Sequence, residues 1–176
     1  MKATSNLDLI DSSYSSSFLC TPKLLKLTTK AAKFLKTKNF DTIAFRGMSG
    51  AMVAPLLATK TDKNLMMVRK PKSDCHSKKI VEGYRRVKTY IIVDDFVDSG
   101  LTFVEIYYAI QSYAPSAKCL GILSVSENFG DDDPIFKSLS YMKNNYEQAF
   151  KRYHKARELK KSKAKAKLVK KKRYNK

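Results

Sequence analysis

Residues 90–103 read YIIVDDFVDSGLTF, and the rest of the chain can be organised around this stretch. Its apolar run at residues 91–93 is β-branched, which is typical of a buried strand. Two carboxylates, Asp94 and Asp95, follow the run, and a Ser-Gly-Leu-Thr turn at residues 99–102 then opens onto a helical pattern. Ligands of an open α/β sheet bind beyond the carboxyl ends of its strands. The polar residues here are therefore candidates for a binding site.

The turn at residues 99–102 has the features of a phosphate site. Free N–H groups and the positive end of the helix dipole favour an anion where a helix begins. Gly100 allows a close approach of the backbone or a positive φ, and the neighbouring hydroxyls add donors. The carboxylates of Asp94 and Asp95 would repel a phosphate but suit ribose hydroxyls or a hydrated Mg²⁺. This combination indicates a sugar phosphate; the alternative is a capped strand–turn–helix with solvated acids.

The whole string resembles the phosphoribosyl-diphosphate (PRPP) binding motif of type I phosphoribosyltransferases. That motif is a hydrophobic strand, two acids, three variable residues, Ser or Thr, Gly, any residue, then Ser or Thr, and residues 91–102 match it without departure. The resemblance covers residues 20 to about 130. It implies a phosphoribosyltransferase-type α/β fold, with a mainly parallel sheet flanked by helices. It also implies an enzyme that transfers the phosphoribosyl group between PRPP and a nitrogenous base, releasing diphosphate, with Mg²⁺.

The resemblance gives roles to the residues of this stretch. Asp94 and Asp95 would hold the ribose hydroxyls, counter the positive charge that develops at the anomeric carbon, and serve as Mg²⁺ ligands. Asp98 matches the acid that lies next to the reacting nitrogen of the base in the purine-specific branch, where it would act as a general base. The grip on the 5′-phosphate falls to Ser99, Gly100, Leu101 and Thr102.

A second strand–glycine–helix unit comes earlier in the chain. Residues 41–45 are predicted to form a strand and residues 51–58 a helix, in spite of Pro55, with RGMSG at 46–50 between them. By the same reasoning this is a second anion site, with Arg46 adding a fixed charge; the alternative is a tight turn with an exposed arginine. In the family a loop of this kind holds the diphosphate, a role that the resemblance gives to Arg46, Gly47 and Ser49.

A third short strand at residues 65–68 leads into the polar segment RKPKSDCHSKK at 69–79. A loop of this length in a compact domain is usually functional or disordered. With the Val-Glu-Gly that follows at 81–83, it resembles the mobile catalytic loop of orotate phosphoribosyltransferases. The resemblance gives diphosphate-binding or catalytic roles to Arg69, Lys70, Lys72 and His76. The spacing of the last two departs from the family, so their individual roles stay open, and His76 can equally be a solvated loop histidine.

The alternation of strands and helices also predicts an α/β domain from the residues alone. An amphipathic helix is expected from Pro22 to near Lys38, with Thr21 as its N-cap. Residues 117–125 are expected to form a strand, and the chain from residue 135 is expected to be helical. We divide the chain into a Ser-rich arm at 1–19, a phosphoribosyltransferase-like domain at 20–150, and a Lys/Arg-rich tail at 151–176.

The acceptor base stays open. Phe129 can stack on a base and Asn128 can read its edge, whereas the acids at 131–133 are read as a turn and a helix N-cap. Asp98 favours purine salvage, and the loop at 69–79 favours orotate and pyrimidine biosynthesis. Orotate is slightly favoured over a purine as the acceptor, because three features support it together: the loop at 69–79, the Glu-Gly that follows it and the Arg-Gly turn.

Composition sets the wider limits. The chain has 176 residues, of which 43% are hydrophobic, and this suits one domain with an adequate core. No apolar run approaches the roughly 18 residues that a membrane span needs, and the N-terminus lacks a signal-peptide core. Three widely spaced cysteines fit reduced thiols in the cytosol. We therefore expect a cytoplasmic protein with no membrane partner and, from the family, a homodimer.

The net charge of +19 is spread unevenly. Residues 151–176 hold fourteen Lys or Arg and a single acid, Glu158, and so thirteen of the nineteen net charges. Such a tail, helical or disordered, cannot bury a core, but it can bind nucleic acid through salt-dependent phosphate contacts. A solvated tail without a specific partner is the alternative. The tail also motivates a second functional hypothesis, a non-catalytic PRPP- or nucleotide-sensing module that binds nucleic acid.

Overall fold

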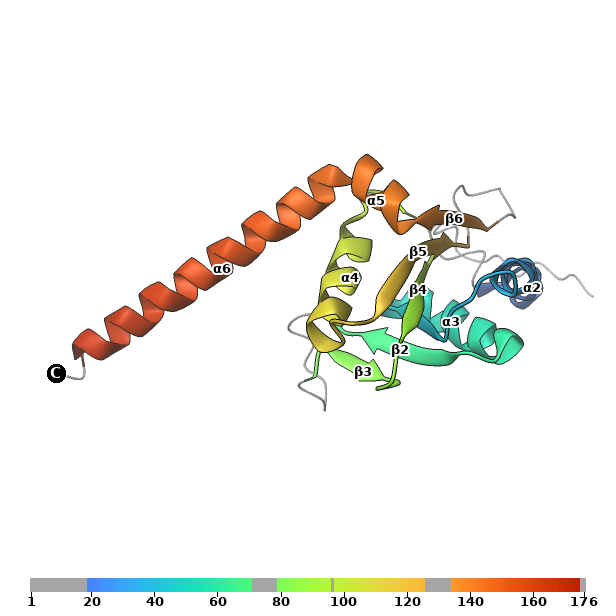
Figure 1. The fold of residues 1–176 in the computed structure, drawn as a ribbon, viewed down its shortest axis with the longest axis horizontal. Coiled ribbons are helices and arrows are strands. Elements are labelled where there is room, and N and C mark those ends of the chain that lie inside the picture. The colour runs from blue at the N-terminus through green and yellow to red at the C-terminus, as the bar shows by residue number, and fades with distance from the viewer. Residues whose placement is uncertain (1–18, 71–78, 96, 126–133, 175–176) are drawn as a thin grey trace, which may run out of the picture.

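The computed structural model describes residues 19–70, 79–95, 97–125 and 134–174. These residues form a six-stranded sheet in the order β3-β2-β1-β4-β5-β6, with helices on both faces (Figure 1). The four central strands are parallel: β2 (Asn64–Val68), β1 (Thr42–Phe45), β4 (Thr89–Asp94) and β5 (Lys118–Ser124). The two edge strands are antiparallel to their neighbours: β3 (Val81–Gly83) and β6 (Ile135–Ser138). The predicted α/β fold with a mainly parallel sheet is confirmed.

Strand β4 lies at the centre of the sheet and is buried on both sides. Its side chains alternate between the two faces of the sheet, so Ile91 and Val93 pack in one core and Tyr90 and Ile92 in the other. A strand that is covered on both faces has no solvent-facing positions, which explains why its sequence is a continuous apolar run.

Helices α2 (Thr21–Leu35) and α3 (Gly47–Thr61) cover the first face, and helices α4 (Leu101–Tyr113) and α5 (Leu139–Asn145) cover the second. The first turns of α6 (Glu147–Tyr174) also pack on the second face through Ala149. The molecule is therefore a three-layer sandwich. The carboxyl ends of β2, β1 and β4 meet at one edge of its middle layer, as the parallel register requires.

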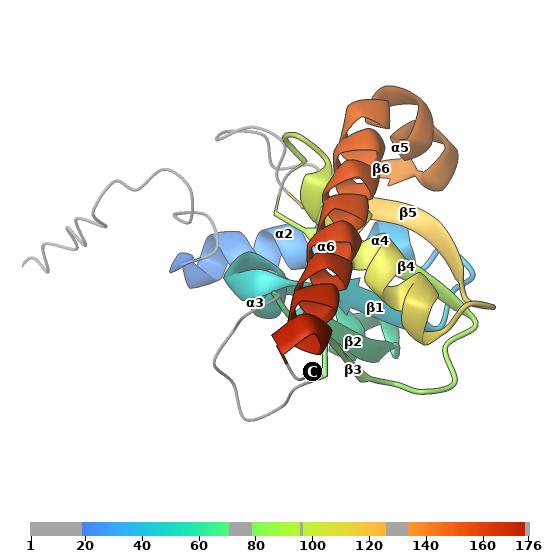
Figure 2. The ribbon, with the colours of Figure 1, turned by 90° about the vertical axis from the view of Figure 1, so that its left-hand side faces the viewer.

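Helix α6 continues far beyond the packed layers (Figure 1) and projects toward the viewer in Figure 2. All its side chains from His154 to Lys163 are exposed. The predicted boundary between residues 150 and 151 lies inside this helix, so the basic tail continues the last helix of the domain without a linker. None of the described helices has both the length and the apolarity that a membrane span requires.

Three local predictions are corrected by the structure. Cys20, not Thr21, occupies the N-cap position of α2, and the helix ends at Leu35 because the chain then tightens into turns. The glycine loop expected before the second helix is itself the first turn of α3, which begins at Gly47. The chain from Ile135 is not helical at first, because it pairs with β5 as the edge strand β6.

Candidate active site

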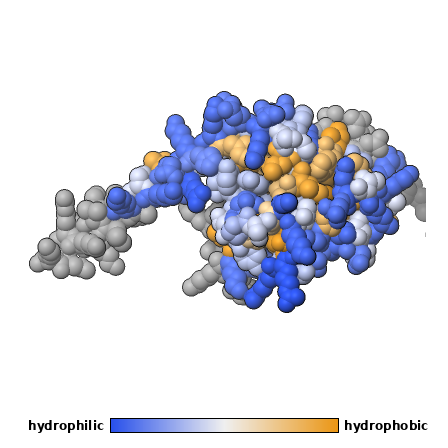
Figure 3. Space-filling model, in the orientation of Figure 1, coloured by the Kyte–Doolittle hydropathy of each residue, from blue (hydrophilic) through white to orange (hydrophobic). Residues whose placement is uncertain are grey.

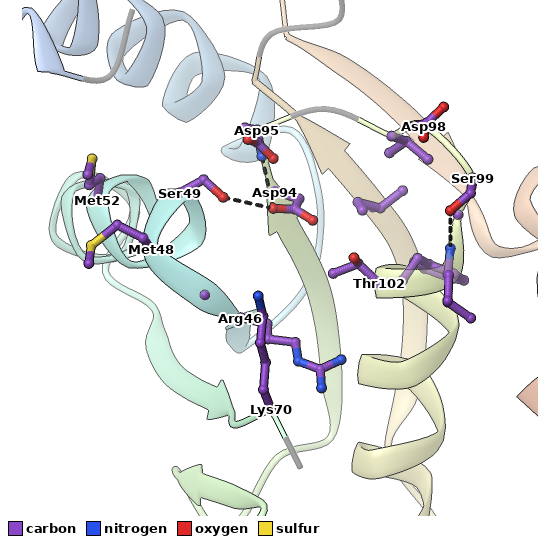
Figure 4. Close-up of a pocket in the computed structure, with 16 residues that line it drawn as sticks. Arg46, Met48, Ser49, Met52, Lys70, Asp94, Asp95, Asp98, Ser99 and Thr102 are labelled. Carbon is purple, nitrogen blue, oxygen red and sulfur yellow. Dashed lines mark hydrogen bonds between the residues drawn. The ribbon is translucent and has the colours of Figure 1, made fainter. Parts of the chain in front are cut away.

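A cavity of about 380 Å³ lies at the carboxyl ends of β2, β1 and β4, between the N-terminal ends of α3 and α4 (Figure 4). Three neighbouring parallel strands end here in charged residues, which is the position where an open α/β sheet binds its ligand. Eleven of the fourteen predicted site residues line the cavity: Arg46, Gly47, Ser49, Lys70, Asp94, Asp95, Asp98, Ser99, Gly100, Leu101 and Thr102.

The other three predicted residues do not line it. Arg69 points to the opposite side of its strand end, where its Nε donates to Glu82 Oε1 at 2.8 Å. Side chains alternate along an extended segment, so consecutive residues such as Arg69 and Lys70 cannot both face the cavity. Lys72 and His76 lie outside the described residues, as do Asn128, Phe129 and the acids at 131–133.

The two carboxylates at the end of β4 are buried and close together. Asp94 Oδ1 accepts a hydrogen bond from Ser49 Oγ at 3.3 Å and from the backbone N–H of Asp95 at 3.1 Å. Asp95 Oδ2 is buried and has no hydrogen-bond partner among the described residues. Burial and the adjacent charge of Asp95 raise the pKa of Asp94 from 3.8 to about 7. The pair is therefore destabilised in the free protein, and a ligand that brings hydroxyl donors or a cation would relieve it.

The N-terminal end of α4 faces this pair. Gly100 is the N-cap and has a φ of 73°, a conformation that favours glycine. A Cβ at this position would lie 2.5 Å from Tyr146 Cδ1, so the space is also closed to a side chain. The first bond within the helix runs from the N–H of Val104 to the carbonyl of Gly100. The N–H of Leu101 donates to Ser99 Oγ at 3.4 Å. The N–H groups of Thr102 and Phe103 have no acceptor inside α4, which leaves donors for an anion next to the hydroxyl of Thr102.

Charge is divided between the two ends of the cavity. Figure 4 shows Arg46 and Lys70 at one end, Asp95 and Asp98 at the other, and Asp94 between them. A ligand that spans the cavity would therefore meet cations at one end, carboxylates at its middle, and the helix N-terminus beside them.

Arg46 is held by protein groups rather than directed at the acids. Its guanidinium forms an ion pair with Glu105 of α4 and donates from Nη2 to the carbonyl of Arg69 at 3.4 Å. The Nε of Arg46 is buried without a hydrogen-bond partner among the described residues. The partner Glu105 was not among the predicted site residues. Glu105 lies three residues after Thr102 and therefore on the same side of the helix. This spacing is the sequence feature that could have identified it as a site residue.

Solved structures resemble this fold, whereas no protein-family model and no curated protein matches the chain in sequence. An adenine phosphoribosyltransferase from Saccharomyces cerevisiae matches with a TM-score of 0.52 and 19% identity, over 64% of this chain and 72% of that one. The adenine phosphoribosyltransferase of Leishmania tarentolae matches with a TM-score of 0.51 and 13% identity, over 62% and 60%. A UMP synthase from Leishmania donovani matches with a TM-score of 0.50 and 22% identity, over 59% and 22%.

The fold is that of the type I phosphoribosyltransferases. The chain spans less than two thirds of the Leishmania tarentolae enzyme and about a fifth of the UMP synthase. The likeness therefore establishes the architecture and not the chemistry.

Within this phosphoribosyltransferase fold, the fit of Mg²⁺ can be tested on the acids of the site. No group of three or more His, Cys, Asp or Glu side chains in the described part of the chain could hold a metal ion by itself. Mg²⁺ is commonly bound by one or two carboxylates together with water and substrate phosphates. Asp94 and Asp95, with the unpartnered Oδ2 of the latter, fit that partial ligand set. These two residues could hold Mg²⁺ jointly with a phosphorylated substrate.

One wall of the cavity is apolar and was not predicted. Met48 and Met52 of α3 line it, and Met48 is 73% exposed. Flexible thioether side chains adapt to the shape of a flat ring. Nothing in the local sequence separates these methionines from ordinary core residues, because only the fold shows that this side of α3 borders a cavity.

Proposed function

We propose that the protein is a PRPP-dependent phosphoribosyltransferase, a glycosyltransferase of the pentosyl class. The observation that carries the proposal is the cavity itself. In a phosphoribosyltransferase-type fold it combines two buried carboxylates at the end of β4 with a free helix N-terminus and two cations. A sugar that carries a phosphate at one position and a diphosphate at another complements this arrangement of donors and charges.

The proposed reaction is a displacement at the anomeric carbon of PRPP. The bond from this carbon to the diphosphate oxygen breaks, and a bond to a ring nitrogen of the base forms. Asp94 and Asp95 hold the ribose hydroxyls and stabilise the positive charge that develops on the sugar. Residues 99–102 hold the 5′-phosphate, and Arg46 and Lys70 face the diphosphate, with Gly47 and Ser49 beside them. Asp94 and Asp95 could also hold Mg²⁺, which would supply further neutralisation of the diphosphate.

The acceptor in this proposal is a nitrogenous base. Asp98 is exposed at the acidic end of the cavity and accepts the proton that the base loses. The sequence slightly favours orotate, and a purine is the alternative. The apolar wall formed by Met48 and Met52 suits a planar ring of either kind.

The test is the release of diphosphate from PRPP and Mg²⁺ in the presence of orotate, hypoxanthine, guanine, adenine or uracil in turn. Turnover with one of these bases is expected, and the double variant Asp94→Asn, Asp95→Asn should abolish it while leaving the protein folded. Glu147→Gln, which changes an exposed acid of α6, is the matched control and should turn over normally. Normal turnover in the double variant would refute the roles given to the acids.

The second candidate function is a non-catalytic module that senses PRPP or a nucleotide. The long basic helix α6 favours it, because an enzyme acting on small molecules has no evident need for such an extension. Binding of PRPP without turnover of any base would support this candidate. Light scattering of the full chain would test the homodimer that the family resemblance implies.

A further inference from the structure

A second cavity, of about 670 Å³, lies on the far side of Arg46 from the candidate active site. It is bounded by residues 79–81 beside β3, by the C-terminal half of α4 and by α6, and we call it the α4–α6 groove. Helix α6 begins near α4 and diverges from it toward its own C-terminal end (Figure 1). Tyr153 and Lys160 are the residues of α6 that line the groove.

The groove and the helix beside it carry positive charge. Four cations and one acid line the groove: Arg46, Arg69, Lys79, Lys160 and Glu105. Two of the cations are paired with acids, Arg46 with Glu105 and Arg69 with Glu82. The charge continues along the described part of α6, where Glu158 is the single acid among residues 151–165. At 1.5 Å per residue this segment is about 20 Å long. An occupant of the groove that also follows α6 must therefore be an extended polyanion.

Aromatic side chains form the other part of the lining. The rings of Tyr108 and Tyr153 stack with centroids 4.7 Å apart, and this pair forms one wall. Tyr113 is 41% exposed and Ile80 is 53% exposed, which leaves flat apolar surface open to a ligand. A basic track combined with exposed aromatic rings is the arrangement that binds single strands, because phosphates follow the cations and bases stack on the rings.

We propose that the α4–α6 groove, together with the exposed side of α6, binds single-stranded nucleic acid. Its bases lie against Tyr113 and the neighbouring apolar surface, and its phosphates follow the cations from Lys160 along α6. The groove shares Arg46 with the candidate active site, but strand binding to it requires no turnover and can be measured whether or not the proposed reaction occurs.

Two other polyanionic partners fit the surface less well. The bases of a duplex are already stacked inside the double helix, so they are not free to stack on the tyrosine rings of the groove. A membrane-bound helix needs an apolar face opposite its basic one, whereas the described part of α6 beyond Tyr153 is mostly hydrophilic (Figure 3) and has Leu159 as its large apolar side chain.

The experiment measures fluorescence anisotropy of the full-length protein with a labelled 20-nucleotide oligothymidylate. Oligouridylate of the same length, a duplex of the same length and anionic lipid vesicles are the comparison partners. Lys160→Glu should weaken single-strand binding by roughly tenfold and lower the dependence of affinity on salt. Lys23→Glu, an exposed lysine of α2 on the opposite face of the sheet, is the matched control and should have a much smaller effect.

Tyr113→Ala should weaken single-strand binding by about tenfold without changing its salt dependence, because stacking is lost but phosphate contacts remain. Tyr141→Ala, which removes a ring of similar exposure from α5, should leave the affinity unchanged. Equal or tighter binding of the duplex or of vesicles would overturn the proposal. An unchanged affinity of the Tyr113→Ala variant would overturn it as well, because the bases would then not enter the groove.

Discussion

Replacing Asp94 by Asn should stabilise the free protein at neutral pH while destroying its capacity to bind PRPP. Asp94 is buried beside Asp95, and its pKa is raised from 3.8 to about 7. A raised carboxyl pKa means that ionisation costs stability in the folded state, so stability is highest at low pH and is lost as the pH rises from about 4 through about 7. One pH unit is worth about 1.4 kcal/mol, which sets an upper bound of about 4 kcal/mol on this cost.

The measured loss of stability on ionisation of Asp94 will be smaller than this bound. Ser49 and the N–H of Asp95 already donate hydrogen bonds to Asp94, and the cavity admits water. We expect Asp94→Asn to gain on the order of 1–2 kcal/mol in free energy of unfolding at pH 8 and almost nothing at pH 4.5. Urea denaturation at four pH values between these limits measures this difference. Asp98→Asn, which removes one negative charge from an exposed acid nearby, is the control for the change in net charge.

A loss of stability in Asp94→Asn at pH 8, or a gain over the wild type that does not grow with pH, would contradict the raised pKa of Asp94. A second readout separates stability from function. Saturating PRPP and Mg²⁺ should raise the melting temperature of the wild type but not of Asp94→Asn. A variant that is more stable yet still binds PRPP normally would show that the strain at Asp94 has no part in binding.

Three further predictions concern neighbouring features. Glu105→Gln should lower the stability of the free protein by about 1–3 kcal/mol, because it removes the counter-charge of the buried Arg46, but should strengthen PRPP binding several-fold in a titration, because Glu105 competes with the diphosphate for Arg46. Gly100→Ala should lose about 1–2 kcal/mol in urea denaturation, since alanine resists a positive φ and its Cβ would press on Tyr146, and should raise the KM for PRPP. Deleting residues 155–176 should leave diphosphate release near normal and reduce retention on nucleic acid at low salt; a loss of turnover would place this segment in the fold or the site.

The fold could be predicted from the sequence where local patterns match the final environment. The β-branched run of β4 indicates a strand because both of its faces are buried, and the Ser-Gly-Leu-Thr turn indicates a helix start because such residues favour that position. Residues 135–138 could not be assigned in this way. Four residues carry no clear period, and their strand exists because the edge of β5 was available for pairing.

The site was predictable to the same degree and for related reasons. Polar residues at the ends of strands could be expected to converge, because the ends of parallel strands meet. The sequence did not indicate on which side of its strand end each of them lies. Alternation sends Lys70 to the cavity and Arg69 to Glu82, and this choice depends on the register with which β2 joins the sheet.

Arg46 illustrates what only the tertiary structure can supply. Its sequence neighbours identify it as an anion-binding residue, yet its guanidinium contacts a carboxylate 59 positions away, and it borders both the candidate active site and the α4–α6 groove. A buried arginine requires a counter-charge, and three groups could provide one: Glu105, a diphosphate in the cavity, or a phosphate in the groove. One guanidinium cannot pair fully with all three groups at once. The group that is paired with Arg46 therefore determines how strongly ligand binding in the cavity affects ligand binding in the groove. Glu105 holds it in the free protein, so the chemistry proposed for the cavity and the partner proposed for the groove both depend on how readily Glu105 releases it.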